Sequence, residues 1–173
     1  VYVTGTIGDA GLGLRALQAV IKPTASAKKF LVDRYRLPAP RMAIGGAVAG
    51  LASASIDVSD GLLADAGHIA ETSGAAIELI AAKIPLSAPA AQWLGGREDA
   101  DSAIADLASC GDDYEILFTA PAARRRSIEM ASQVTKTPVA RIGAVVRGKG
   151  VRLLDEKGSA LATPKRGYDH FEG

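Results

Sequence analysis

The irregular order of strand-like and helix-like segments constrains the fold of this chain more than any other feature. Runs of β-forming residues cover 1–4, 55–58, 75–84, 114–119, 139–146 and 151–154. Runs with helical spacing or small residues cover 12–21, 28–36, 41–52, 59–73, 86–94, 102–109 and 122–133. The last two β-type runs flank a glycine-containing turn and predict an antiparallel hairpin. This order predicts an α+β fold, with a mixed, largely antiparallel sheet flanked by helices.

Composition narrows the class of protein further. Of 173 residues, 48% are hydrophobic but only 5% are aromatic, so we expect a core of Ala, Val, Leu and Ile. The net charge of +1 argues against a strongly basic nucleic-acid-binding protein and against an acidic disordered tail. The most apolar stretch, 42–54, is interrupted by glycines and is shorter than the ~20 residues that span a bilayer. We therefore expect neither a nucleic acid nor a membrane as a partner.

One cysteine, Cys110, excludes an internal disulfide and a cysteine-based metal cluster within the 173 residues. This is compatible with a reducing compartment, and we expect a cytoplasmic protein. The first residues, VYVTG, look like a strand already under way and do not include an initial Met. We expect the chain to be the C-terminal part of a longer protein.

Asp57-Val58-Ser59-Asp60-Gly61 is the strongest local motif, at a predicted junction between a strand and a helix. Free backbone N–H groups and the helix dipole favour anions at such a junction. Two carboxylates with a hydroxyl between them also suit a hard cation such as Mg²⁺ that holds phosphate oxygens. The alternative interpretation is a simple helix cap with acids that favour the dipole.

A second acidic motif, Cys110-Gly111-Asp112-Asp113-Tyr114-Glu115, directly precedes a predicted buried strand. One of its acids could contact a cationic or hydroxylated ligand, or the motif could be a solvated turn. The glycine-rich segment 5–13 is neither a Walker motif nor a clean GxGxxG, so it either cradles phosphate or caps the next helix. His68 has no second histidine near it in the sequence, which argues against zinc.

Several of these strings together resemble the C-terminal half of thiamine-monophosphate kinases. They are DVSDGLLADAGHIAETSGAAIEL, GDDYEILF, the terminal GYDHF, and the earlier YVTGTIGDAGLGL and YRLPAPR. Strings like DVSDGL also occur in related enzymes, among them aminoimidazole ribonucleotide synthetase and selenophosphate synthetase. The combination with GDDYE and GYDHF is what points to the kinase.

The resemblance implies an enzyme that transfers the γ-phosphoryl group of ATP to thiamine monophosphate, with Mg²⁺, in a homodimer of two-domain subunits. It implies that residues 1–173 form a single C-terminal α+β domain of the aminoimidazole ribonucleotide synthetase-like fold. The N-terminal ATP- and Mg²⁺-binding domain would then be absent from this chain, and the chain alone would be inactive. Two alternatives are another enzyme of the same superfamily, acting on a purine precursor or selenide, and a non-catalytic binding or packing module.

Carried over by motif, the resemblance assigns roles to five residues. Asp57 and Asp60 would bind Mg²⁺, Ser59 would contact ATP, and Asp112 and Tyr168 would contact the substrate. None of the five is assigned a covalent catalytic role. The family usually has Glu at the position of Asp112, so the carboxylate here is one methylene shorter.

Overall fold

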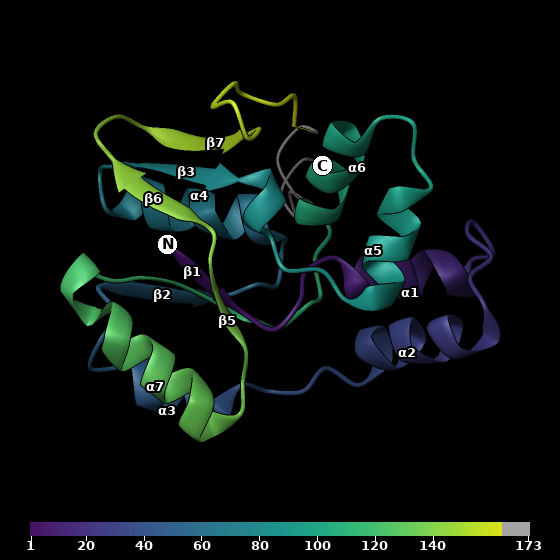
Figure 1. The fold of residues 1–173 in the computed structure, drawn as a ribbon, viewed down its shortest axis with the longest axis horizontal. Coiled ribbons are helices and arrows are strands. Elements are labelled where there is room, and N and C mark those ends of the chain that lie inside the picture. Colours follow the sequence, from purple (N-terminus) through teal and green to yellow (C-terminus); the bar gives the residue numbers. More distant parts are fainter. Residues whose placement is uncertain (164–173) are drawn as a thin grey trace, which may run out of the picture.

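Two β-sheets form the centre of the molecule in the computed structural model, which describes residues 1–163 (Figure 1). The first is antiparallel, in the order β2-β4-β1-β5, with strands β1 (Tyr2–Thr4), β2 (Ala54–Asp57), β4 (Ile116–Thr119) and β5 (Val139–Arg141). The second, in the order β6-β3-β7, has strands β3 (Ala76–Ile80), β6 (Gly143–Val146) and β7 (Gly150–Leu154). The parallel pair β3–β7 makes the strand pairing mixed but largely antiparallel. The predicted α+β class is confirmed, with two sheets in place of one.

The predicted hairpin of 139–146 with 151–154 is wrong. The first run divides at Ile142, whose N–H donates to Val1 O (3.0 Å) and whose carbonyl accepts from Ile80 N–H (2.8 Å). This one residue therefore joins both sheets, and β3 lies between β6 and β7. Gly143 permits the close approach of β6 to β3, because a Cβ there would lie 2.0 Å from Glu78 O. The glycine-containing turn at 147–150 is a local feature, whereas β6 and β7 both pair with β3, a strand more than 60 residues earlier.

Seven α-helices lie within residues 1–163, near the seven helical runs of the sequence. They are α1 (Asp9–Leu17), α2 (Ala25–Arg36), α3 (Met42–Val48), α4 (Leu62–Thr72), α5 (Ala88–Gly95), α6 (Ala100–Ala108) and α7 (Arg125–Thr135). Short 3₁₀ turns, η1 (Ala81–Lys83) and η2 (Ala122–Arg124), follow β3 and precede α7. The run predicted as a helix from residue 59 starts only at Leu62, which leaves the preceding acidic motif as a turn.

The helices form three groups around the sheets (Figure 1). Helices α3 and α7 pack together and share a small core with the four-stranded sheet, in which the rings of Tyr2 and Phe118 stack at 5.2 Å. Helix α4 contacts strands of both sheets. Helices α1, α2, α5 and α6 pack at the other end of the molecule. Among the helices of the described residues, none combines the length and the apolar character that a membrane span requires.

The larger core is aliphatic, as the composition predicted. It brings Val3 and Leu117 of the first sheet together with Leu62 of α4 and Leu79 of β3, all fully buried. Because α4 is anchored in this core through Leu62, its first turn is fixed beside the ends of β2 and β4. The acidic turn that precedes Leu62 is thereby held at the edge of the first sheet.

Candidate functional site

The two acidic motifs lie side by side, although about 50 residues separate them in the chain. Asp112 N–H donates to Ser59 O (2.9 Å), and Tyr114 N–H donates to Val58 O (2.9 Å). In return, Val58 N–H donates to Glu115 O (2.8 Å). These bonds extend the β2–β4 pairing into the loops beyond both strands. The backbone therefore fixes the spacing between the motifs.

Two glycines make this close contact possible. A Cβ on Gly111 would lie 2.4 Å from Ser59 O, and one on Gly61 would lie 2.7 Å from Ser109 O. Gly61 also has a φ of 112°, in the region that L side chains rarely adopt. Each motif thus contributes one glycine at the point where its backbone meets the other motif.

The outward side of the paired motifs carries carboxylates that have no partner within residues 1–163. Asp57 is exposed at the end of β2, and Ser59, Asp60 and Asp112 are partly exposed. Within residues 1–163, no donor forms a hydrogen bond to the carboxylates of Asp57, Asp60 or Asp112. Among the described residues nothing occupies these carboxylates, so they can bind a ligand from solvent.

Asp65, one turn into α4, holds the first motif in shape. Its buried carboxylate accepts hydrogen bonds from Ser59 N–H (3.0 Å) and Asp60 N–H (3.1 Å). Burial raises the pKa of Asp65 to about 6, partly offset by the Asp60 N–H, while the Asp60 charge raises it further. Sequence reasoning missed this role. The sequence feature that could have indicated it is the position of Asp65 on the apolar face of a helix, next to Ala66 and one turn after Leu62.

Asp60, Asp65 and His68 each present a ligand atom within 4.8 Å of the others. His68 is exposed, and the Asp65 carboxylate already accepts two N–H groups. Within residues 1–163, the three-residue group has one histidine and no cysteine, unlike a typical zinc site. Asp57 lies outside this group of three. The carboxylate oxygens of Asp57 and Asp60 fit the oxygen ligands that Mg²⁺ prefers.

The inward side of the second motif is a buried ion-pair network. The Glu115 carboxylate is fully buried and accepts from the Thr4 hydroxyl at 2.7 Å. It also accepts from Arg34 (2.9 Å) and, through both oxygens, from Arg41 (2.7 and 2.6 Å). The network joins β1, α2 and the segment before α3 to the second motif. The sequence predicted that an acidic motif precedes a buried strand but did not predict the arginine partners of Glu115.

Asp113 also points inward, where its buried carboxylate caps α1. It accepts from Gly8 N–H (2.6 Å) and Ala10 N–H (3.1 Å). Burial raises the pKa of Asp113 to about 7 against the opposing effect of these two bonds, and the nearby Asp9 charge raises it further. The N-terminus of α1 is therefore already occupied by the protein's own carboxyl group. For the glycine-rich segment 5–13, this favours the helix-capping interpretation over phosphate binding.

Cys110, which the sequence also singled out, gives no sign of a reactive thiol. Cys110 is partly buried, and burial raises the pKa of its thiol to about 11, so it is protonated at neutral pH. Tyr168 lies outside the described residues. The structure thus brings four of the five expected site residues, Asp57, Ser59, Asp60 and Asp112, to one edge of the first sheet.

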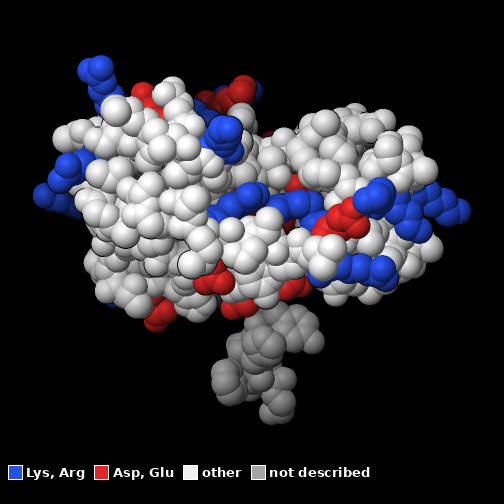
Figure 2. All heavy atoms as spheres, turned by 90° about the horizontal axis from the view of Figure 1, so that it is seen from below, with Lys and Arg blue, Asp and Glu red and all other residues white. Residues whose placement is uncertain are grey.

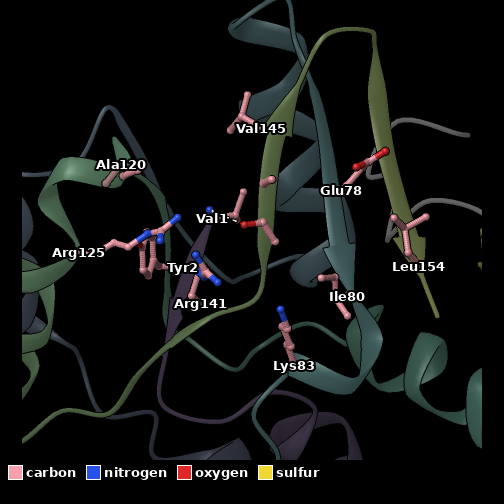
Figure 3. A pocket seen from close by; sticks show the side chains of 13 residues that line it. Val1, Tyr2, Glu78, Ile80, Lys83, Ala120, Arg125, Arg141, Val145 and Leu154 are labelled. Carbon is pink, nitrogen blue, oxygen red and sulfur yellow. Dashed lines mark hydrogen bonds between the residues drawn. The ribbon is translucent and has the colours of Figure 1, made fainter. Parts of the chain in front are cut away.

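A hollow of about 400 Å³ lies elsewhere, where the two sheets meet (Figure 3). Lys83, Arg125 and Arg141 line it, together with Glu78 and the N-terminal residue Val1. None of the residues of the two acidic motifs lines this hollow. Across the face shown in Figure 2, basic and acidic side chains alternate in the hollowed middle between two lobes, without one dominant sign of charge.

Comparison with solved structures defines the class of fold first. The hydrogenase maturation protein HypE of Escherichia coli has a TM-score of 0.64 and 18% identity over 99% of this chain, a likeness of fold alone. A thiamine-monophosphate kinase from Stenotrophomonas maltophilia K279a gives a TM-score of 0.80 and 36% identity, covering 92% of this chain and 50% of that one. The fold is thus the aminoimidazole ribonucleotide synthetase-like α+β fold.

Sequence comparison then narrows the relationship. Thiamine-monophosphate kinase from Caulobacter vibrioides is 36% identical over 97% of this chain and 47% of its own length. The Escherichia coli K12 enzyme is 34% identical over 99% of this chain and 52% of its own length. No protein-family model matches the chain. The chain is a homologue of the C-terminal part of thiamine-monophosphate kinases, and it spans about half the length of these relatives.

Proposed function

We propose that this chain is the C-terminal domain of an ATP-dependent thiamine-monophosphate kinase. The complete enzyme would transfer the γ-phosphoryl group of ATP to thiamine monophosphate and release thiamine diphosphate. One observation carries the proposal: the acids of two distant motifs lie together, unpartnered within residues 1–163, in a chain related to these kinases over nearly all its length. A similar solved structure, AaThiL complexed with AMPPCP and TMP (TM-score 0.79, 31% identity), supports the choice of substrates.

In this proposal Asp57 and Asp60 bind Mg²⁺, which would neutralise the phosphate charge that develops during transfer. Their exposed or half-exposed carboxylates lack internal hydrogen-bond donors within residues 1–163, which supports this role. Ser59, between them, contacts ATP. Its backbone N–H is already held by Asp65, so the side-chain hydroxyl is the group offered to the nucleotide.

Asp112 and Tyr168 contact thiamine monophosphate. The Asp112 N–H bond to Ser59 O keeps its side chain close to the proposed ATP contact, which supports a role at the same site. A carboxylate attracts the cationic heterocycle of the substrate, and an aromatic ring can stack on it. Because Asp is shorter than Glu, Asp112 would reach the substrate through a water.

The proposal includes a second domain. The chain spans about half of its kinase relatives, which supports a further ATP- and Mg²⁺-binding domain in the complete protein. Residues 1–173 would then be one C-terminal domain that is inactive by itself. The proposal also includes that the complete protein forms a homodimer and is located in the cytoplasm.

The test is an assay of the complete protein for conversion of thiamine monophosphate to thiamine diphosphate, measured by chromatography. We expect product only when both ATP and Mg²⁺ are present. A purine precursor and selenide serve as competing substrates, and residues 1–173 alone serve as the inactive control. Turnover of a competing substrate without thiamine diphosphate formation would overturn the proposal. Turnover by residues 1–173 alone would overturn its two-domain part.

A further inference from the structure

We propose that Asp113 is a positioning residue, whose buried carboxylate holds the loop that presents Asp112 and Tyr114 at the site. This inference rests on the proposed function, because it concerns the substrate side of the same site. Asp113 itself faces away from the outward acids, so it would act only through the loop. Its neighbours on either side are the residues that face outward.

Backbone strain in the loop is the first reason. Asp112 has a φ of 68° and Tyr114 a φ of 48°, both in the left-handed region that non-glycine residues avoid. Two such residues flank Asp113, so the loop needs an anchor to keep this conformation. The 41% exposure of Tyr114 shows that its side chain does not provide the anchor.

Asp113 has the contacts of an anchor. Both of its carboxylate oxygens are used, one by Gly8 N–H (2.6 Å) and the other by Ala10 N–H (3.1 Å). When the carboxyl is ionised, these two bonds are charge-assisted and are among the stronger ones in proteins. Its main-chain carbonyl also accepts from Arg34 of α2 at 3.4 Å. The middle of the loop is thereby tied to α1 and α2, while its outer residues bond to the first motif.

Packing next to the loop reinforces the tie to α1. A Cβ on Gly11 would lie 2.5 Å from the side chain of Cys110, and one on Gly8 would lie 2.9 Å from Leu107. Helix α1 therefore sits directly against the chain that leads into the loop. A change at the carboxylate of Asp113 would loosen this contact and alter how Asp112 is presented, without removing a group that touches substrate.

The experiment compares the complete protein with its Asp113→Asn variant, which keeps the side-chain size. The amide can accept one N–H, but its own NH₂ group faces the other donor, so one bond is lost. Hydrogen exchange by mass spectrometry follows the peptide covering 110–116. We expect its amides to exchange about tenfold faster, while those of α7 are unchanged.

Kinetics give the second readout. We expect the Michaelis constant for thiamine monophosphate to rise about two- to threefold, no more than on loss of the Asp112 side chain itself, and that for ATP to stay unchanged. The matched control is Ile128→Val, a core change in α7 that lowers stability away from the site. It should leave the ratio of the two Michaelis constants unchanged. If Asp113→Asn does not fold, Asp113→Ser repeats the test with a shorter acceptor.

Unchanged exchange of peptide 110–116 in a folded variant would overturn the inference. So would faster exchange with both Michaelis constants unchanged, because the loop would then not position the substrate contact. Absence of thiamine-monophosphate turnover in the unaltered protein would instead overturn the proposed function. In that case the exchange experiment alone decides whether Asp113 holds the loop.

Discussion

The two faces of the paired acidic motifs have the same kind of side chain in opposite environments. Inward, Asp113, Glu115 and Asp65 are buried, and each carboxylate accepts at least two hydrogen bonds. Outward, Asp57 and Asp60 are exposed or partly exposed and accept none from residues 1–163. This difference in burial and hydrogen bonding shows that neighbouring acids in the sequence do not all belong to one binding site. Burial and partners separate the acids that hold the fold from those that can bind a ligand.

The largest expected effect comes from the inward face. Glu115→Gln keeps the size of the side chain but leaves Arg41 without its buried counter-charge, and leaves Arg34 with only the more distant Asp9 carboxylate at 3.7 Å. Breaking a buried ion pair by removing one partner costs about 3–5 kcal/mol of stability. Urea unfolding of the protein should show this loss as a lower midpoint at unchanged slope.

The control for Glu115 is Glu78→Gln, which breaks the more exposed pair between Glu78 and Arg152 (2.7 Å). A surface pair of this kind contributes about 0–1 kcal/mol. Equal losses for the two variants would mean that the buried network does not stabilise the fold more than a surface pair, and the contrast between the faces would fail.

The second largest expected effect concerns the outward face, where a substitution should change the rate of phosphoryl transfer. Asp57→Asn should lower the proposed kinase rate of the complete protein about a hundredfold, a loss typical of removing a group that stabilises charge in the transition state. Its stability should change by less than about 0.5 kcal/mol, because the side chain is exposed. Steady-state kinetics at saturating Mg²⁺ and thermal unfolding measure the two quantities.

Asp33→Asn is the matched control, since Asp33 is an exposed acid on α2 that pairs only with Lys29 among the described residues. It should leave the rate unchanged. A normal rate for Asp57→Asn would favour the alternative that Asp57 is merely an acid near a helix start, and would remove it from the proposed Mg²⁺ site.

The contact between the motifs gives an intermediate effect. In Gly111→Ala the new methyl group would lie 2.4 Å from Ser59 O, so the two loops must move apart. Overpacking of this kind costs about 1–3 kcal/mol. Gly67→Ala is the control, because nothing lies within 4 Å of a Cβ there. Calorimetric melting should separate the two variants, and equal melting temperatures would contradict the tight contact.

Local patterns in the sequence were enough to predict the α+β class, the seven helices and the two acidic motifs. Periodicity predicts which side of a helix is buried, and the burial of Leu62 in the first turn of α4 follows from it. The hairpin prediction was wrong because strand pairing depends on residues that are far apart in the sequence. Nothing near residues 147–150 indicates that β3 enters between the last two strands.

The partners of the buried acids could not be predicted either, because these partners are also far away in the sequence. Asp113 lies 105 residues from Gly8, and Glu115 lies 74 residues from Arg41. A motif states which chemical groups are present, whereas the fold decides which of them meet. The adjacency of the two motifs was likewise implied only by the resemblance to a kinase family, and the hydrogen bonds between Val58–Ser59 and the second motif now explain it.

The smallest expected effect tests the substrate side of the outward face. Asp112→Ala should raise the Michaelis constant for thiamine monophosphate several-fold, since a water-mediated contact is weaker than a direct charged one. The Michaelis constant for ATP should stay within about twofold, because Asp112 is expected to touch only the other substrate. Asp112→Glu should lower the constant for thiamine monophosphate, because the longer side chain reaches the substrate without a water. Initial-rate kinetics with each substrate varied in turn measure these constants. Equal rises for both substrates in Asp112→Ala would show that the variant disturbs the Ser59 side of the site, and Asp112 would lose its assigned role.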